Sequence, residues 1–380
     1  MTVAGSGRLP WRDSGIWLTG DTHSHYRLVG FEELVSQAGK HCDFLALTSH
    51  PHMPDALKSQ PALIEAGRPQ YGGLILINGV QWNAPIGDSV TVLAPGVTQG
   101  VPLLEEFLQR FDVQLGGTEE TEENFLEGLR FLGERPIDGV VPVALLQHPH
   151  GTRTFSVEQI RSALDAGPAL VGFCVSSGRR GKESAEGAVH PWASEVGGVA
   201  DTLFAEGRRV TMVAESDFHQ PNTEGRVEFW PGQFRKTCLY CPERSETGVF
   251  AGLRSGASYF VVGNIVENLR IMASAGGQAA IMGEVLAVTD ASAVEVTVEL
   301  TERRRLDSME LIGNPGGEAR ILAQAGTADL VRENDTVRWT VRLDVVPGDF
   351  FLRLRGQGRA KDPPGAPACF YTAPLWVSCR

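Results

Sequence analysis

Most of the nine histidines in this sequence stand within three residues after a short apolar run. The runs are GIWLTG, DFLAL, VALLQ and TMVAES. The clusters that follow them are Asp21-Thr-His23-Ser-His25, Thr48-Ser-His50, His148-Pro-His150 and Asp217-Phe-His219. In an α/β barrel the carboxyl ends of the strands face one mouth, so side chains at those ends are positioned to converge. The four clusters therefore predict one shared site.

The chemistry of these side chains is that of a metal site. Imidazoles and carboxylates are common ligands of zinc and similar divalent ions. Residues i and i+2 of an extended segment point to the same side, so His23 and His25 can reach one ion. An isolated H-x-H is a weak signal, whereas four clusters in an ordered series predict a metal centre.

The elements that must position these residues follow a β/α pattern between residues 17 and 263. Continuous apolar runs typical of buried parallel strands occur at 43–48, 74–78, 141–147, 169–175 and 210–214. Amphipathic segments at 31–40, 119–132 and 157–166 supply the intervening helices. This alternation predicts an α/β barrel or a doubly wound sheet.

The character of the sequence changes after residue 263. Segments 294–300, 308–312, 337–345 and 350–354 alternate apolar and polar residues with a period of two, and turn residues separate them. This pattern predicts a smaller β-sandwich-like domain. We therefore expect an α/β barrel domain at 1–264 and a β-rich domain at 265–380.

Composition limits the class of partner and the compartment. The net charge is −12 and the pI is about 5.3, which disfavours nucleic-acid and anionic-membrane binding and favours a small-molecule partner. No apolar stretch approaches the roughly 18 residues of a membrane span, and the amino terminus lacks a signal-peptide pattern. We expect a cytoplasmic protein with reduced cysteines. The oligomeric state is left open.

Several motifs resemble those of a known superfamily. GDTHSH at 20–25, TSH at 48–50, His148-Pro149 and SDFH at 216–219 are similar to motifs of the polymerase and histidinol phosphatase (PHP) superfamily. The stretch LRSGASYFVVG and the ending YTAPLWVS look like its CehA/McbA-like metallohydrolase branch. The resemblance spans nearly the whole chain.

The resemblance implies a distorted (β/α)7 barrel that binds one to three divalent ions, zinc, manganese or iron. By position in the motifs, His23, His25 and Asp217 would hold one ion. His148 would help to hold a second ion, and His50 with His219 a third. Asp21 would orient an imidazole.

Three positions depart from the superfamily pattern. Gln81 stands where a bridging glutamate is usual, Asp88 stands where a histidine is usual, and Ser49 replaces the aspartate of T-D-H. A neutral amide is a weaker ligand than a carboxylate, whereas an aspartate still binds through oxygen. Gln81 and Asp88 remain candidate ligands, and we expect one or two firmly held ions in place of the fuller cluster.

Three residues are candidates for catalysis beyond the metal ligands. His52 and His150 each lie two residues after a candidate ligand and can donate a proton or contact substrate, because imidazole titrates near neutral pH. Arg27 can neutralise an anionic substrate. Each histidine could instead belong to a polar loop, and Arg27 could form a structural ion pair.

The expected activity is hydrolysis by metal-activated water of a small-molecule phosphoester or related ester. The CehA/McbA-like branch points instead to a carbamate, carboxylic ester or amide, for which Trp82 and Phe218 would supply an apolar pocket. Two further hypotheses are a catalytically degenerate ligand-binding barrel and an iron-dependent redox enzyme, because Gln81 and Ser49 alter the ligand set.

Overall fold

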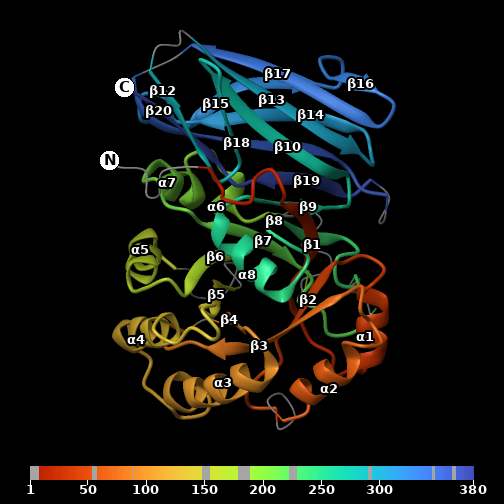
Figure 1. Ribbon diagram of the computed structural model, residues 1–380, viewed down its shortest axis with the longest axis vertical. Coiled ribbons are helices and arrows are strands. Elements are labelled where there is room, and N and C mark those ends of the chain that lie inside the picture. The colour runs from red at the N-terminus through yellow and green to blue at the C-terminus, as the bar shows by residue number, and fades with distance from the viewer. Residues whose placement is uncertain are drawn as a thin grey trace.

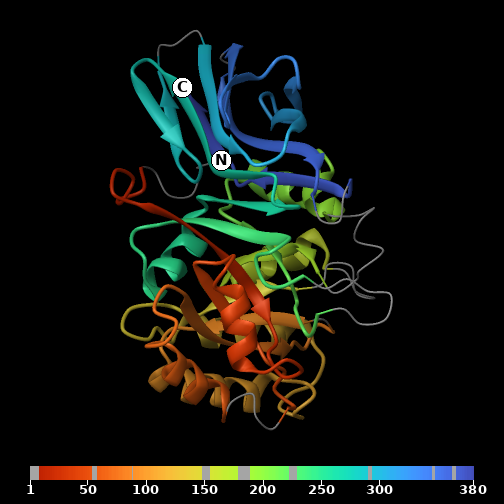
Figure 2. The same ribbon diagram turned by 90° about the vertical axis from the view of Figure 1, so that its right-hand side faces the viewer.

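The computed structural model describes residues 8–53, 58–87, 89–147, 155–178, 189–221, 229–289, 293–344, 347–361 and 365–380. Helices surround one group of strands in the lower part of the molecule, and layered strands form the upper part (Figure 1). The view from the side shows the same two parts stacked along the long axis (Figure 2). None of the described helices is long and apolar enough to cross a membrane.

Seven strands in sequence order form the lower sheet. They are β1 (Ile16–Ser24), β2 (Phe44–Leu47), β3 (Ile75–Asn83), β4 (Ser89–Ala94), β5 (Val143–Leu146), β6 (Leu170–Ser177) and β7 (Thr211–Glu215). Strand β4 runs antiparallel to β3 and β5, and the other neighbours are parallel. The segment after β7 returns to β1, where the His25 amide donates to the Phe218 carbonyl at 2.8 Å. The sheet is thereby bent into a distorted barrel.

The helices are α1 (Phe31–Ala38), α2 (Gln60–Gly67), α3 (Val97–Phe111), α4 (Glu122–Gly133), α5 (Val157–Asp165), α6 (Pro191–Ser194), α7 (Val199–Ala205) and α8 (Glu246–Ser255). Local sequence sets their starts: Ser156 and Gln159 form a capping box before α5. Inside the barrel, Leu18, Phe44 and Leu145 pack with Val249 and Phe250 of α8. Burial of this apolar cluster leaves polar side chains at the opposite, carboxyl end of the strands.

Among the described residues, thirteen more strands follow: β8 (Arg235–Cys241), β9 (Ser258–Val262), β10 (Val266–Ala275), β11 (Gln278–Ile281), β12 (Val285–Val288), β13 (Ala293–Glu302), β14 (Leu306–Gly313), β15 (Arg320–Gly326), β16 (Val331–Glu333), β17 (Thr336–Asp344), β18 (Gly348–Arg359), β19 (Pro367–Thr372) and β20 (Leu375–Cys379). Strands β11-β10-β13-β17-β16 form a separate antiparallel sheet. This sheet faces one built on β18, and apolar residues of both share one core.

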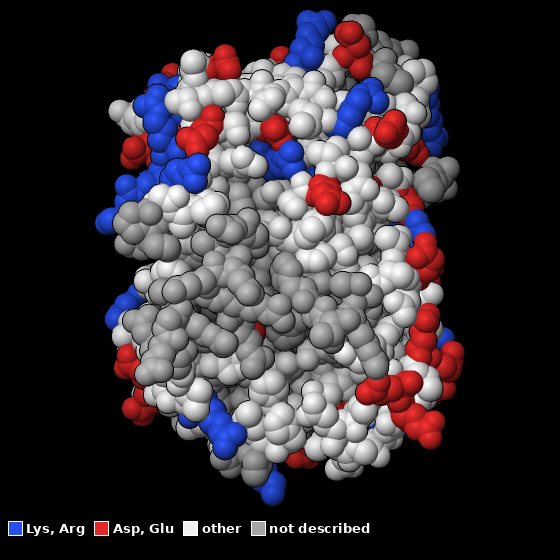
Figure 3. Space-filling view, turned by 180° about the vertical axis from the view of Figure 1, so that it is seen from behind, with Lys and Arg blue, Asp and Glu red and all other residues white. Residues whose placement is uncertain are grey.

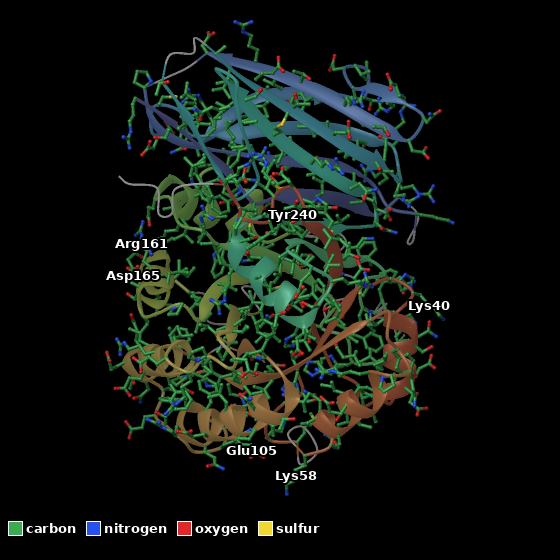
Figure 4. The ribbon with its side chains drawn as sticks, viewed as in Figure 1. Lys40, Lys58, Glu105, Arg161, Asp165 and Tyr240 are labelled. Atoms are coloured by element: carbon green, nitrogen blue, oxygen red, sulfur yellow. The ribbon has the colours of Figure 1, made fainter. Side chains whose placement is uncertain are left out.

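The two predicted domains share hydrogen-bonded structure. The boundary predicted at 264/265 falls between β9 and β10, yet β19 pairs with β9 and so joins the upper sheet to the barrel sheet. Buried Arg353 of β18 also pairs with buried Asp201 of α7, with Nη2 to Oδ2 at 3.0 Å. Tyr240, which Figure 4 places where the two parts meet, donates its hydroxyl to the Arg12 carbonyl. The division into separate domains stays a prediction.

The predicted fold class is confirmed: a mixed α/β barrel precedes a β-rich part with its own five-stranded sheet. The antiparallel strand β4 was not among the predicted strands. Its Ser89 and Thr91 interrupt the apolar run, because these two side chains face the polar end of the barrel. Seen from behind, charged side chains of both signs are interspersed over the upper half, and acidic ones gather along the lower right edge (Figure 3).

Candidate metal centre

An irregular end of β1 carries the first histidine pair. The register between β1 and β2 shifts between Asp21 and Ser24, and such bulges re-aim side chains. Asp21 supports the bulge, because its Oδ1 accepts the His23 amide at 3.0 Å and its Oδ2 accepts the Ser216 amide at 2.9 Å. The Asp21 carboxylate thus holds two backbone segments together, and its predicted role in orienting an imidazole stays a prediction.

His23, His25 and Asp217 place three donor atoms around one point. The two Nε2 atoms are 3.1 Å apart, and each lies 3.4 Å from Oδ1 of Asp217. Ligands at 2.0–2.1 Å from a tetrahedral ion are separated by about 3.4 Å. All three side chains are buried, and the spacing of their donor atoms fits three ligands of one ion.

A second group shares His25 with the first. His25, His50 and His219 offer ring nitrogens within 4.8 Å of one another. The His25 ring stacks on that of His50 with centroids 4.8 Å apart and lies 4.3 Å from that of His219. The His219 Nδ1 is 3.8 Å from Oδ1 of Asp217. Five of the predicted ligands thus meet at the barrel mouth, and their roles as ligands remain proposals.

Burial sets the protonation of this centre. Desolvation lowers the pKa of His25 well below its usual value, and lowers the pKa of His50 to about 4, so both imidazoles stay neutral near pH 7. Desolvation raises the pKa of Asp21 to about 7 and the pKa of Glu215 well above its usual range. Neutral imidazoles have the free lone pair that a metal ion requires.

Turn geometry after β7 aims the Asp217 carboxylate. Asp217 has φ of 46°, in the left-handed region that aspartate tolerates better than most residues. Its amide donates to the His23 carbonyl at 3.1 Å, which fixes the segment against β1. The next residue, Phe218, is fully buried and stacks on Trp230.

Gln81 lies beside the first group. Its cross-strand neighbour on β4 is Thr91, whose hydroxyl contacts Nδ1 of His23 at 2.5 Å. The Gln81 Nε2 donates to Ser89 Oγ at 2.9 Å, and its buried Oε1 has no hydrogen-bond partner among the described residues. The amide oxygen could therefore coordinate a metal ion, and the role of Gln81 as a metal ligand stays a prediction.

The remaining predicted site residues have different outcomes. His52 is exposed, with its ring 5.3 Å from that of His50, and Arg27 is exposed at the rim of a cleft. The ligand candidates Asp88 and His148 and the catalytic candidate His150 lie outside the described residues. The catalytic roles of His52 and Arg27 stay predictions.

That cleft has a volume of about 820 Å³ and is lined largely by α1 and the segment before it. Ser49 and Tyr26, the chain neighbours of His50 and His25, form part of its lining, but none of the four described histidines of the centre does. The other lining residues include Arg27, Glu32, Glu33, Met53, Leu63 and Tyr71. The surface of the cleft therefore combines aromatic, aliphatic, hydroxyl and charged side chains.

Two residues expected to supply an apolar pocket do not. Trp82 is fully buried on the other face of β3, where it packs against Phe107 and Phe125 and donates Nε1 to the Phe111 carbonyl. Phe218 is enclosed in the core against Trp230. Both side chains follow strand ends, but alternation along the strand and the turn at Asp217 direct them away from the mouth.

Two further residues contact the segments that carry the centre: Thr91, which the sequence did not indicate, and Glu215, which the sequence placed at most in a supporting role. Thr91 contacts His23 from a strand that was not predicted, so no pattern pointed to it. Glu215 precedes the SDFH motif, and its buried Oε2 accepts the Thr22 hydroxyl at 3.1 Å. A charged residue at the end of an apolar run was the available signal for Glu215.

The α/β barrel and its buried His/Asp groups agree with what the resemblance to PHP motifs leads us to expect. No family model and no curated protein matches the sequence. One similar solved structure is endonuclease Q in complex with a 27-mer duplex with an abasic lesion, at 14% identity, over 63% of this chain and 57% of that chain, with a TM-score of 0.38.

Another similar structure is PsfC from Pseudomonas syringae PB-5123, at 15% identity, over 61% of this chain and 85% of that chain, with a TM-score of 0.35. The present chain spans little more than half the length of the endonuclease Q chain. At these TM-scores neither similarity is evidence for the fold or the activity of this chain. The structure itself shows an α/β fold with a candidate His/Asp metal site.

Proposed function

We propose that this chain is a metal-dependent hydrolase of a small-molecule phosphoester or related ester. The observation that carries the proposal is the triangle of buried donor atoms formed by His23, His25 and Asp217, with sides of 3.1, 3.4 and 3.4 Å. Two imidazoles and one carboxylate with a position left open are typical of catalytic zinc sites.

A divalent ion at this position would lower the pKa of bound water and polarise the scissile bond. The protein's own residues supply the geometry. Thr91 contacts Nδ1 of His23 and so orients its Nε2 toward the other two donor atoms. Zinc, manganese and iron all accept this donor set.

The cleft beside Ser49 is the proposed place for the organic part of the substrate. Tyr26, Leu63 and Tyr71 offer aromatic and aliphatic surface, and Ser59 offers a hydroxyl that contacts the Tyr26 hydroxyl at 3.2 Å. Such a wall also suits an uncharged carboxylic ester, carbamate or amide, which is the second candidate substrate class. A small-molecule substrate and the absence of a nucleic-acid partner remain proposals.

Metal content and hydrolysis measured on the same preparations test the proposal. Protein purified without a metal-affinity tag is analysed by plasma mass spectrometry and assayed with phosphomonoesters, phosphodiesters, carboxylic esters and carbamates. We expect near-stoichiometric metal and turnover of one of these classes. A His23→Ala, His25→Ala double variant should lose both, while His41→Ala, a partly buried histidine after α1, should keep both.

Two results would contradict the proposal. No bound metal, and none taken up on reconstitution, would leave a ligand-binding barrel. Stoichiometric iron with oxidation of a substrate and no hydrolysis would favour the redox hypothesis.

A further inference from the structure

Arg235, the first residue of β8, is a buried cation without an acidic partner in the described part of the chain. Its exposed fraction is 4%, and no described carboxylate lies within ion-pair distance of it. Its Nε donates to Ser176 Oγ at 2.9 Å, and its buried Nη2 has no hydrogen-bond partner among the described residues. By contrast, buried Arg353 pairs with Asp201.

The sheet register places Arg235 at the mouth of the barrel. Side chains two and four residues apart on a strand share a face, and Leu239 and Cys241 of β8 belong to the barrel core. Thr237 is opposite Gly20 in the antiparallel β1–β8 pair, so Arg235 lies further toward the carboxyl end of β1. Ser176, its hydrogen-bond partner, is near the carboxyl end of β6.

Gln147 adds a second set of unused polar atoms at the same end. It follows β5 and is fully buried, and neither Oε1 nor Nε2 has a hydrogen-bond partner among the described residues. Leu145, two residues earlier, faces the barrel core, so the Gln147 side chain is on the interior face. Its backbone amide donates to the Ser89 carbonyl at 3.0 Å, near the strand position of Thr91.

Buried polar groups without partners are costly, and a buried charge costs most. Burial lowers the pKa of Arg235 to about 10, so its guanidinium is still protonated at pH 7. A guanidinium and an amide N–H are the donors that proteins use to bind phosphate and carboxylate oxygens. Arg27, the arginine expected from the sequence to meet an anion, is instead exposed.

We propose that Arg235 and Gln147 bind an oxyanion, a phosphate or carboxylate group of the substrate, at the barrel mouth. This assignment of the anion to a substrate rests on the proposed hydrolase function. An anionic substrate would be held by its charged group at Arg235, while the organic part extends from the metal ligands toward the cleft.

Anion binding to metal-depleted protein tests this assignment without relying on turnover. Inorganic phosphate and acetate are titrated separately by calorimetry. We expect one of the two to bind and the other to bind more weakly, which distinguishes a phosphate site from a carboxylate site. Arg235→Met should weaken binding at least tenfold, Gln147→Leu several-fold, and Arg235→Lys less than Arg235→Met.

Arg254→Met is the matched control, because Arg254 donates to the carbonyls of Val141 and Pro142 at the opposite end of the strands. It should leave anion affinity unchanged. The proposal is overturned if wild type binds neither anion at millimolar concentration, or if folded Arg235→Met or folded Gln147→Leu binds as tightly as wild type. Plasma mass spectrometry of the same proteins distinguishes failure of the anion site from failure of the hydrolase proposal. If wild type takes up no metal but still binds phosphate, the hydrolase proposal is refuted and the anion site at Arg235 stands.

Discussion

The junction between the barrel and the upper sheets differs from the barrel mouth in how buried charge is satisfied. At the junction, both carboxylate oxygens of Asp201 bind Arg353, and Oδ2 also accepts the Gly197 amide. At the mouth, the buried imidazoles of His23 and His25 share the Asp217 carboxylate, and Arg235 has no acidic partner in the described chain. Both regions are enclosed, so exposure does not explain the difference.

This difference indicates that the charged groups at the junction stabilise the fold, whereas those at the barrel mouth are arranged to bind a ligand. The charges of the Arg353–Asp201 pair match each other within the chain, although Nη1 of Arg353 has no hydrogen-bond partner among the described residues. Buried donors and acceptors without partners lower stability unless something binds them, and proteins keep them at functional sites. Substitutions at the junction should therefore change stability, and those at the mouth should change binding.

The largest expected effect is at the junction. Arg353→Met leaves Asp201 buried without its cation and should lower the free energy of unfolding by about 3–5 kcal/mol. Arg338→Met, which removes an exposed pair with Glu299, should lower the free energy of unfolding far less than Arg353→Met does. Urea denaturation measures both. Equal costs would contradict the junction's assigned role, as would loss of metal from folded Arg353→Met.

At the mouth, the His23→Ala, His25→Ala variant should show the opposite pattern. Loss of two ligands should weaken metal affinity by at least about a hundredfold, which corresponds to about 2.7 kcal/mol. The metal-free variant should unfold at nearly the urea concentration of metal-free wild type, because the cost of desolvating two imidazoles offsets much of what their packing contributes. Competition with a chelator gives the affinity. An unchanged affinity would place the ion elsewhere.

A smaller effect is expected from Gln81→Glu. The new carboxylate would replace the amide oxygen beside Thr91 and should tighten metal binding about tenfold, or about 1.4 kcal/mol. In the metal-free protein it should be destabilising, because Asp21, Glu215 and Asp217 already crowd the mouth. Gln109→Glu on the exposed side of α3 is the control. Metal affinity equal to wild type would exclude position 81 as a ligand.

The smallest expected effect is on the pH dependence of the metal-free protein. Burial lowers the pKa of His50 to about 4 in the folded chain from its ordinary value of 6.5. Between pH 6.5 and pH 4, His50 is therefore protonated in the unfolded chain but neutral in the folded chain. His50 therefore contributes stability that is lost as pH falls from 6.5 to 4.

Asp21 acts in the opposite direction: its folded pKa of about 7 lies above the ordinary value of 3.8, so its contribution to stability increases as pH falls. A comparison of wild type with His50→Gln removes this contribution, because Asp21 is present in both proteins. The variant should become more stable relative to wild type as pH falls from 6.5 to 4. Urea denaturation at several pH values provides the measurement. A constant difference between the two proteins would show that His50 titrates normally.

The sequence predicted the ligands better than their surroundings. His23, His25 and Asp217 stand after apolar runs, and strand ends in a barrel converge whatever the details of packing. Thr91 and Arg235 became visible only in the structure, because cross-strand register brings each to the site. Trp82 was misplaced because its position beside Gln81 does not reveal which face of the strand it occupies.

The central claim is that His23, His25 and Asp217 bind one divalent ion. Anomalous diffraction from crystals of the metal-loaded protein, collected at the absorption edge of the bound ion, tests it most directly. We predict a peak about 2.0–2.2 Å from both Nε2 atoms and from the Asp217 carboxylate. A peak at another position, or none in crystals whose protein carries stoichiometric metal, would contradict the claim.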